Sequence, residues 1–120
     1  MKSSRTRESN YVSGASVEVT SSSSALVIGP LNLSLYPKRT VYISNEGEDA
    51  LRNLQIQLGP TSEGPWFDED ISATSPLLTT LGAGIDGFYR LDKADPYLRV
   101  LAQASTSTGT TLLARLAATS

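Results

Sequence analysis

Residues 97–118 read YLRVLAQASTSTGTTLLARLAA and contain two runs in which apolar side chains recur at every second position. The apolar positions are Leu98, Val100 and Ala102 in the first run and Leu112, Ala114 and Leu116 in the second. This period is typical of a β-strand with one buried face. A loop rich in serine and threonine, which contains Gly109, separates the two runs. We therefore expect two strands joined as a hairpin.

Shorter runs of the same kind lie upstream and are separated by glycine and proline. They cover residues 17–19, 25–28, 31–35, 41–43, 54–58 and 85–91. Glycine supplies positive φ and proline removes a ladder donor, so both interrupt sheets. Helix signals are weak, because residues 75–81 contain Pro76 and residues 112–118 favour a strand. The predicted fold class is all-β, a single antiparallel β-sandwich of about seven or eight strands.

The best-patterned strands also predict which side chains are buried. The expected core residues are Leu54, Ile56, Leu98 and Val100. Three more apolar residues fall on the other, nominally solvent-facing side of the expected hairpin, namely Leu101, Leu113 and Ala117. Apolar residues there indicate burial against another chain. We expect a homo-oligomer with closed symmetry, a trimer as the first guess, or else a hairpin buried on both faces within a monomer.

The first 14 residues are polar and charged, and we expect an extended, flexible N-terminal arm before a sandwich domain at residues 15–120. The arm carries three basic residues and one acid, whereas the rest of the chain is net acidic. A basic segment can steer association with an acidic neighbour. The alternative is a frayed terminus. The candidate partner-interface residues are Arg5, Arg7, Tyr11, Val12, Leu101 and Leu113.

The composition argues against several classes of function. The chain of 120 residues contains neither cysteine nor histidine, so it can form no disulfide and no Ser-His or Cys-His pair. We expect no catalytic residue, no cofactor and no metal, and hence a protein that is not an enzyme. A net charge of −2 argues against a nucleic-acid partner. No apolar run approaches the roughly 20 residues that cross a bilayer, so we expect no membrane partner.

Two features leave alternatives open. The acidic stretch Asp68-Glu69-Asp70 is expected to be a solvated loop, although carboxylates could also hold a cation weakly. Trp66 is expected to cap one end of the core, although it could also be an exposed platform for a sugar. The remaining aromatic residues near the C-terminal half are expected in the core or the hairpin rather than on a stacking surface, namely Phe88, Tyr89 and Tyr97.

Several segments together resemble a known group of proteins. Residues 41–47, VYISNEG, are similar to a strand followed by an Asn-x-Gly turn, and residues 50–57 follow it. Residues 64–66, 81–84 and 97–102 add a Gly-Pro-Trp segment, an L-x-x-G turn and a Y-x-R-V-x-A strand. Over residues 40–118 the chain resembles small β-sandwich structural proteins of tailed bacteriophages, including capsid decoration (cement) proteins.

This resemblance implies a non-enzymatic virion protein that decorates a capsid and stabilises it by bridging neighbouring capsid subunits. Its partner would be the major capsid protein or another virion protein, and its location the virion after synthesis in the host cytoplasm. The alternatives are a neck, tail or baseplate component of a phage, and a carbohydrate-binding β-sandwich module that uses Trp66. The resemblance transfers no functional residue, because a shared architecture hosts many functions.

Overall fold

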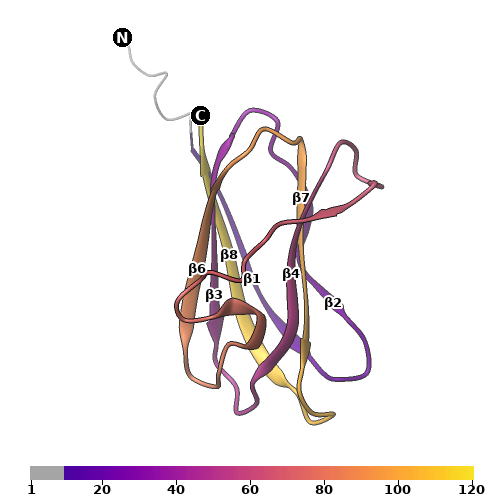
Figure 1. Ribbon diagram of the computed structural model, residues 1–120, viewed down its shortest axis with the longest axis vertical. Coiled ribbons are helices and arrows are strands. Elements are labelled where there is room, and N and C mark those ends of the chain that lie inside the picture. The colour runs from indigo at the N-terminus through magenta and orange to yellow at the C-terminus, as the bar shows by residue number, and fades with distance from the viewer. Residues whose placement is uncertain (1–9) are drawn as a thin grey trace.

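The computed structural model describes residues 10–120, which form two antiparallel four-stranded sheets packed face to face (Figure 1). The first sheet contains, in spatial order, β1 (Asn10–Val19), β8 (Thr110–Thr119), β3 (Lys38–Asn45) and β6 (Asp86–Asp92). The second contains β2 (Ala25–Asn32), β7 (Tyr97–Ala104), β4 (Leu51–Gly59) and β5 (Phe67–Asp68). A single 3-10 turn, η2 (Leu78–Thr80), is the only helical element in this part of the chain. The expected all-β sandwich is confirmed.

The strand order is that of a jelly roll. The first strand pairs with the last, the second with the seventh, the third with the sixth and the fourth with the fifth. All connections except the one from β4 to β5 therefore cross from one sheet to the other. This is the arrangement of the double-sheet jelly rolls, which wrap a long hairpin around a common core.

The expected C-terminal hairpin is wrong, because β7 and β8 lie in different sheets. Residues 105–109 cross between the sheets, where Thr106 accepts a hydrogen bond from the Ser21 amide at 3.0 Å. The Asp49 carboxylate fixes the same crossing, since it accepts bonds from the hydroxyls of Ser105 and Thr106 at 2.5 and 2.8 Å. Alternation predicts which face of a strand is buried. It does not predict the partner strand, because two strands show the same alternation whether they pair in one sheet or face each other across the core.

The core lies between the sheets and is built mainly from leucine, isoleucine and valine. All four expected core residues are confirmed as fully buried: Leu54, Ile56, Leu98 and Val100. The register of β4 against β7 shifts between Arg52 and Gln55, where Asn53 has a φ of +56°. This bulge lets Leu51 and Leu54 both point inward, although strict alternation would place them on opposite faces.

Two boundaries differ from the sequence-based expectation. Strand β1 begins at Asn10, so residues 10–14 of the expected arm belong to the first sheet and pair with β8. The first nine residues, which include Arg5 and Arg7, lie outside the described residues. Residues 31–35 are not one strand, because β2 ends at Asn32, and Leu33 is buried whereas Leu35 is 73% exposed in the connection to β3.

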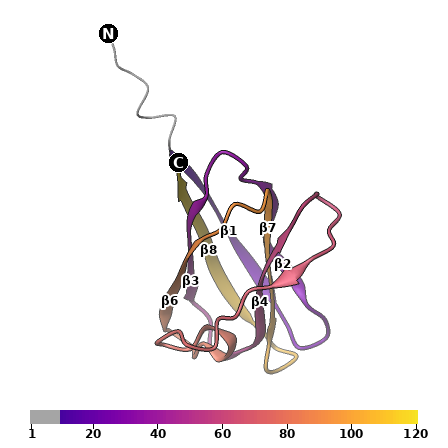
Figure 2. The same cartoon turned by 45° about the horizontal axis from the view of Figure 1, so that its top comes forward.

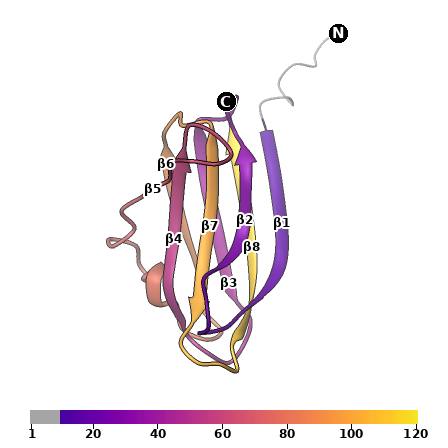
Figure 3. The same cartoon turned by 90° about the vertical axis from the view of Figure 1, so that its right-hand side faces the viewer.

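The two long sides of the sandwich are closed differently. The connection from β5 to β6 covers one side, where it inserts Ile71, Leu78 and Leu81 into the core. Figure 3 shows this connection on one side of the molecule and β1 at the opposite margin. At the end where β1 starts and β8 stops (Figure 2), the buried Arg39 donates to the carbonyls of Leu33 and Tyr36 at 3.0 and 2.8 Å.

Candidate interaction surface

The outer face of the first sheet carries apolar side chains in register across four strands. One row across the sheet is Val12, Ala117, Thr40 and Arg90, and the next is Gly14, Arg115, Tyr42 and Phe88. A third row contains Ser16, Leu113, Ser44 and Asp86. We call the residues Val12, Tyr42, Phe88, Leu113 and Ala117 the outer apolar face. They share this side because positions of equal parity on paired strands point the same way.

Three of these side chains are markedly exposed. Val12 is 74% exposed, Tyr42 43% and Phe88 50%. The rings of Tyr42 and Phe88 are cross-strand neighbours with centroids 6.3 Å apart, and the Arg90 guanidinium lies 5.5 Å from the Phe88 centroid. Aromatic pairs of this kind stabilise each other and leave one broad surface for a partner.

A shallow groove runs between these side chains. Its volume is about 310 Å³, and the residues that line it are Val12, Tyr42, Ser44, Asp86, Gly87, Leu113, Arg115, Leu116 and Ala117. Arg115 and Asp86 give the groove one positive and one negative charge at its margin. An apolar surface with charges of both signs at its edge is suited to a protein partner.

The structure separates the six residues predicted for a partner interface. Val12 and Leu113 lie together on the outer apolar face. Leu101 lies on the outer side of the other sheet, where it pairs with Leu26 and Gln55, so it shares no surface with Leu113. Tyr11 belongs to β1 and its backbone pairs with Ala118, whereas Arg5 and Arg7 precede the described residues.

Trp66 is neither a core cap nor an open platform. The Arg99 guanidinium stacks over its ring, 4.3 Å from the centroid. The backbones of Gly59 and Gly64 approach the same indole so closely that a Cβ on either glycine would lie 3.1 Å or less from its ring atoms. Trp66 is therefore a partly buried residue, and Arg99 occupies a ring face that a sugar platform would need open.

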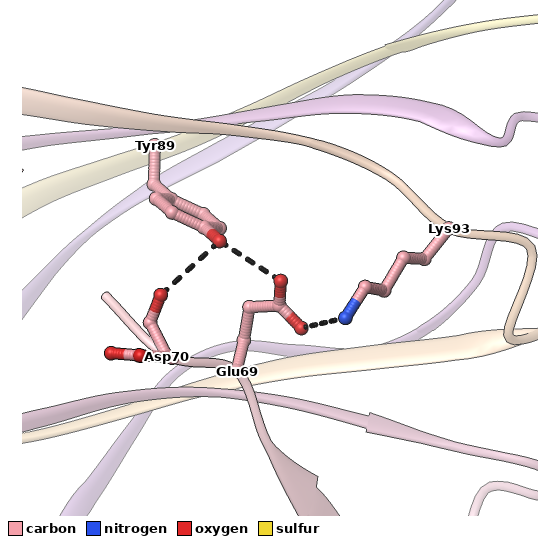
Figure 4. A network of polar contacts seen from close by, with 4 residues as sticks. All are labelled: Glu69, Asp70, Tyr89 and Lys93. Atoms are coloured by element: carbon pink, nitrogen blue, oxygen red, sulfur yellow. Dashed lines mark hydrogen bonds and ion pairs between the residues drawn. The ribbon is translucent and has the colours of Figure 1, made fainter. Parts of the chain in front are cut away.

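The acidic stretch is occupied by protein partners. Asp68 accepts from the Gln57 amide at 2.7 Å, and Gln57 in turn accepts from Arg99 at 2.7 Å. Glu69 accepts from the Tyr89 hydroxyl at 2.9 Å and forms an ion pair with Lys93 at 2.9 Å (Figure 4). Among residues 10–120, no three His, Cys, Asp or Glu side chains lie close enough together to hold a metal ion.

This network ties the connection after β5 to β6. Burial, together with the hydrogen bond to Glu69 and the charges of Glu69 and Asp70, raises the pKa of Tyr89 to about 12. The hydrogen bond from Lys93 to Glu69 raises the pKa of that lysine. Both groups are therefore protonated at neutral pH, and their bonds to Glu69 connect the loop after β5 to β6 and to the residue that follows it.

Two site features were missed by the sequence reasoning. Tyr42 alternates with the buried Val41 and Ile43, and this parity alone places it outside. Phe88 was expected in the core, but in β6 the inward positions belong to Gly87, Tyr89 and Leu91. Residues 82–87 also spell GAGIDG, the letters of a dinucleotide-binding fingerprint, but they lead into strand β6 and open no helix, so the context for that function is missing.

Comparison with known proteins identifies the fold but no family. No family model and no curated protein matches the chain. Among solved structures, the Bacillus endospore appendage protein, described as forming disulfide-linked pili, matches with a TM-score of 0.54 and 9% identity over 93% of this chain and 88% of that one. The SPBc2 prophage-derived protein YomS has a TM-score of 0.44 and 11% identity over 91% of this chain and 96% of its own.

A third similar structure is the IMPa protein of Pseudomonas aeruginosa, solved with an O-glycopeptide, with a TM-score of 0.43 and 15% identity. That match covers 93% of this chain but 13% of IMPa. At these identities the likeness concerns the fold alone. No helix within residues 10–120 is long and apolar enough to cross a membrane.

Proposed function

We propose that this protein is a non-enzymatic structural subunit of a phage particle, one that decorates the capsid and stabilises it by bridging neighbouring capsid subunits. The observation that carries the proposal is the outer apolar face, where Tyr42 and Phe88 are exposed as neighbours on β3 and β6, and Val12 is exposed on β1, across β8 from them. The sequence resemblance over residues 40–118 supports the phage context, and jelly rolls are frequent among viral capsid domains.

In this role the outer apolar face contacts the capsid. Burying a large apolar side chain completely contributes up to about 1.5–3 kcal/mol, so a few anchors suffice for attachment when the linked subunits of one oligomer bind neighbouring sites together. Arg90 and Arg115 at the margin can bind carboxylates of the major capsid protein or another virion protein. We also expect a homo-oligomer, and neither nucleic acid nor membrane as a partner.

The test is the occupancy of variants on purified particles. Mass spectrometry first establishes whether particles from the source of this sequence contain the protein. A Tyr42→Ser, Phe88→Ser variant should then lose at least tenfold in occupancy on particles that lack the native protein. Leu35→Ser is the control, because Leu35 is more exposed than Tyr42 and Phe88 but lies off this face. Full occupancy of the double variant would refute attachment through the outer apolar face.

The neck, tail or baseplate alternative uses the same surface and differs in position, so imaging of labelled particles separates it from decoration. The carbohydrate-binding alternative has weaker support, because the Trp66 ring is covered by Arg99. A glycan array would decide it: saturable binding that disappears in Trp66→Ala but survives in Tyr42→Ser, Phe88→Ser would favour the sugar-binding module over the structural role.

A further inference from the structure

The four edge strands of the two sheets differ in their protection against pairing. Strand β2 contains Pro30 and two register irregularities, and β5 consists of two residues. Strand β6 carries three charged side chains, Asp86, Arg90 and Asp92. Strand β1 pairs with β8 over ten residues without a shift, has no proline, lysine or arginine, and has Glu18 as its one charge. Proline, bulges, short length and charge are the usual devices that block an edge, and β1 has almost none of them.

Strand β1 is also poorly covered on its sides. Ala15, Val17 and Val19 all face the core side of the sheet, because they alternate with the outward positions. Ala15 is nevertheless exposed. Among residues 12–19, whose burial is described, Val19 alone is buried. Val12 projects from the other side and is largely exposed. The second sheet covers β1 at its Val19 end and leaves residues 14–16 exposed. Among the described residues, β1 is an edge strand of its sheet, and it stands at the margin of the molecule (Figure 3).

We propose that β1 of a second copy of this chain pairs along this edge, antiparallel and about a two-fold axis, so that the two first sheets become one eight-stranded sheet. The occupant is a second copy because β1 needs as its partner a long, regular strand with few charges, and among the four edges β1 itself is the one of that kind. An edge of this design satisfies the free backbone groups of both copies at once.

Charge fixes the direction of the pairing. Parallel strands would place Glu18 of one copy beside Glu18 of the other, whereas antiparallel strands place it near the other copy's Asn10. The antiparallel arrangement therefore keeps the two Glu18 carboxylates at opposite ends of the seam.

The register follows from the same constraint. With Gly14 of both copies on the two-fold axis, Asn10 faces Glu18 and Val12 faces Ser16, and all residues between 10 and 18 are paired. The small side chains of Ser13, Gly14, Ala15 and Ser16 leave the seam free of steric conflict. The contact is isologous and closes at two copies. It requires no particle, so it goes beyond the proposed function and can fail or hold independently of it.

The first experiment is sedimentation of the purified full chain across a concentration series. We expect a dimer, and in Ala15→Lys, Ser16→Lys we expect the dissociation constant to rise at least a hundredfold, because lysines on an edge strand oppose its pairing with a second strand, and the two copies together would bring four of them into one seam. Both positions are exposed, so the fold should survive, as far-UV circular dichroism will show. Ser62→Lys, in the exposed β4–β5 loop, is the control and should remain dimeric. A monomer at all concentrations, a trimer, or a dimer unchanged in the double variant would overturn the proposal.

A second experiment tests the register directly. The chain has no cysteine, so a single Gly14→Cys substitution gives an unambiguous disulfide readout. Its Cβ would meet the flexible Arg115 side chain at 3.0 Å, and that side chain is exposed and can move. Directly opposed residues have Cβ atoms about 4.5–5.5 Å apart, near the separation that a disulfide spans. Gly14→Cys should therefore form a disulfide-linked dimer under mild oxidation, while Arg90→Cys on the opposite edge should not; equal cross-linking of the two would refute the pairing.

Discussion

Tyr42 shows how little residue type says about burial in this fold. Its neighbours Val41 and Ile43 are fully buried, while its own ring lies outside and contacts Phe88. The position in the alternating pattern decides the direction of each side chain, and the apolar character of the ring then makes the outer surface suited to a partner. Arg39 is the reverse case, a buried charged residue. Burial lowers its pKa, the charge of Asp95 partly offsets this, and its Nε and Nη2 atoms donate to two backbone carbonyls.

Ile56 provides the sharpest stability test at this scale. It is fully buried between the sheets, so Ile56→Ala should lower the free energy of unfolding by about 2–5 kcal/mol through lost burial and the cavity left behind. Urea unfolding measures the change. Gln55→Ala is the control, because Gln55 points outward from the same strand, and it should change stability by less than about 1 kcal/mol. Similar losses of unfolding free energy in both variants would mean that the register of β4 differs by one residue from the one described here.

At the level of elements, the sequence predicts the centres of strands well and their ends and partners poorly. The buried faces of β4, β7 and β8 follow from alternation, because each has a core on one side. Residues 10–14 were expected in an arm because they show no apolar alternation. An edge strand that buries few side chains needs no such pattern, so its sequence does not identify it as a strand. The partners of β7 and β8 depend on loops that cross between sheets, and a serine- and threonine-rich loop is compatible with a hairpin or a crossing. The outer apolar face was predicted in part, through Val12, Leu113 and Ala117, and its two aromatic members were missed because they also suit a core.

The extent of β1 can be checked by truncation. Removing residues 2–9 should leave the melting temperature close to that of the full chain, whereas removing residues 2–14 deletes half of β1 and its pairs with β8. A loss of 1 kcal/mol corresponds to about 4 °C in a domain of this size, and we expect at least that from the longer truncation. Thermal unfolding by circular dichroism gives both values. Equal melting temperatures for the two truncated chains would return residues 10–14 to the arm.

The crossing between β7 and β8 predicts a pH dependence. The hydrogen bond from Ser105, followed by those from Thr106 and Ala50, lowers the pKa of Asp49. A carboxyl with a lowered pKa in the folded state stabilises the fold above its unfolded pKa of about 3.9, and this stabilisation disappears as the pH falls through the folded pKa.

Asp49→Asn should therefore lower the melting temperature at pH 7, and the gap to the unchanged protein should narrow as the pH falls below about 4. Melting curves between pH 7 and pH 2.5 measure the gap. Glu63→Gln, in an exposed loop, is the control and should track the unchanged protein throughout. A gap that is constant with pH would mean that the Asp49 bonds do not depend on its charge.

For the molecule as a whole, the pairing is nested: only β4 and β5 are close in the chain, and every outer pair joins segments farther apart. This nested strand pairing gives one compact core without a disulfide. It also explains why the fold class could be predicted from the sequence while the strand topology could not. Local alternation is a property of each strand, whereas nesting is decided by contacts between distant segments.

Nesting also sets an order in time. On the ribosome β1 is made first, but its one partner within the chain, β8, is made last, at residues 110–119. Translation proceeds at roughly 5–20 residues per second, so β1 waits several seconds, unpaired and almost uncharged, beside the nascent strands of neighbouring chains on the same message. The strand that ends as the open edge of the folded protein is thus also the segment longest exposed to a second copy during synthesis, and pairing between chains can begin before either has closed its own sheet.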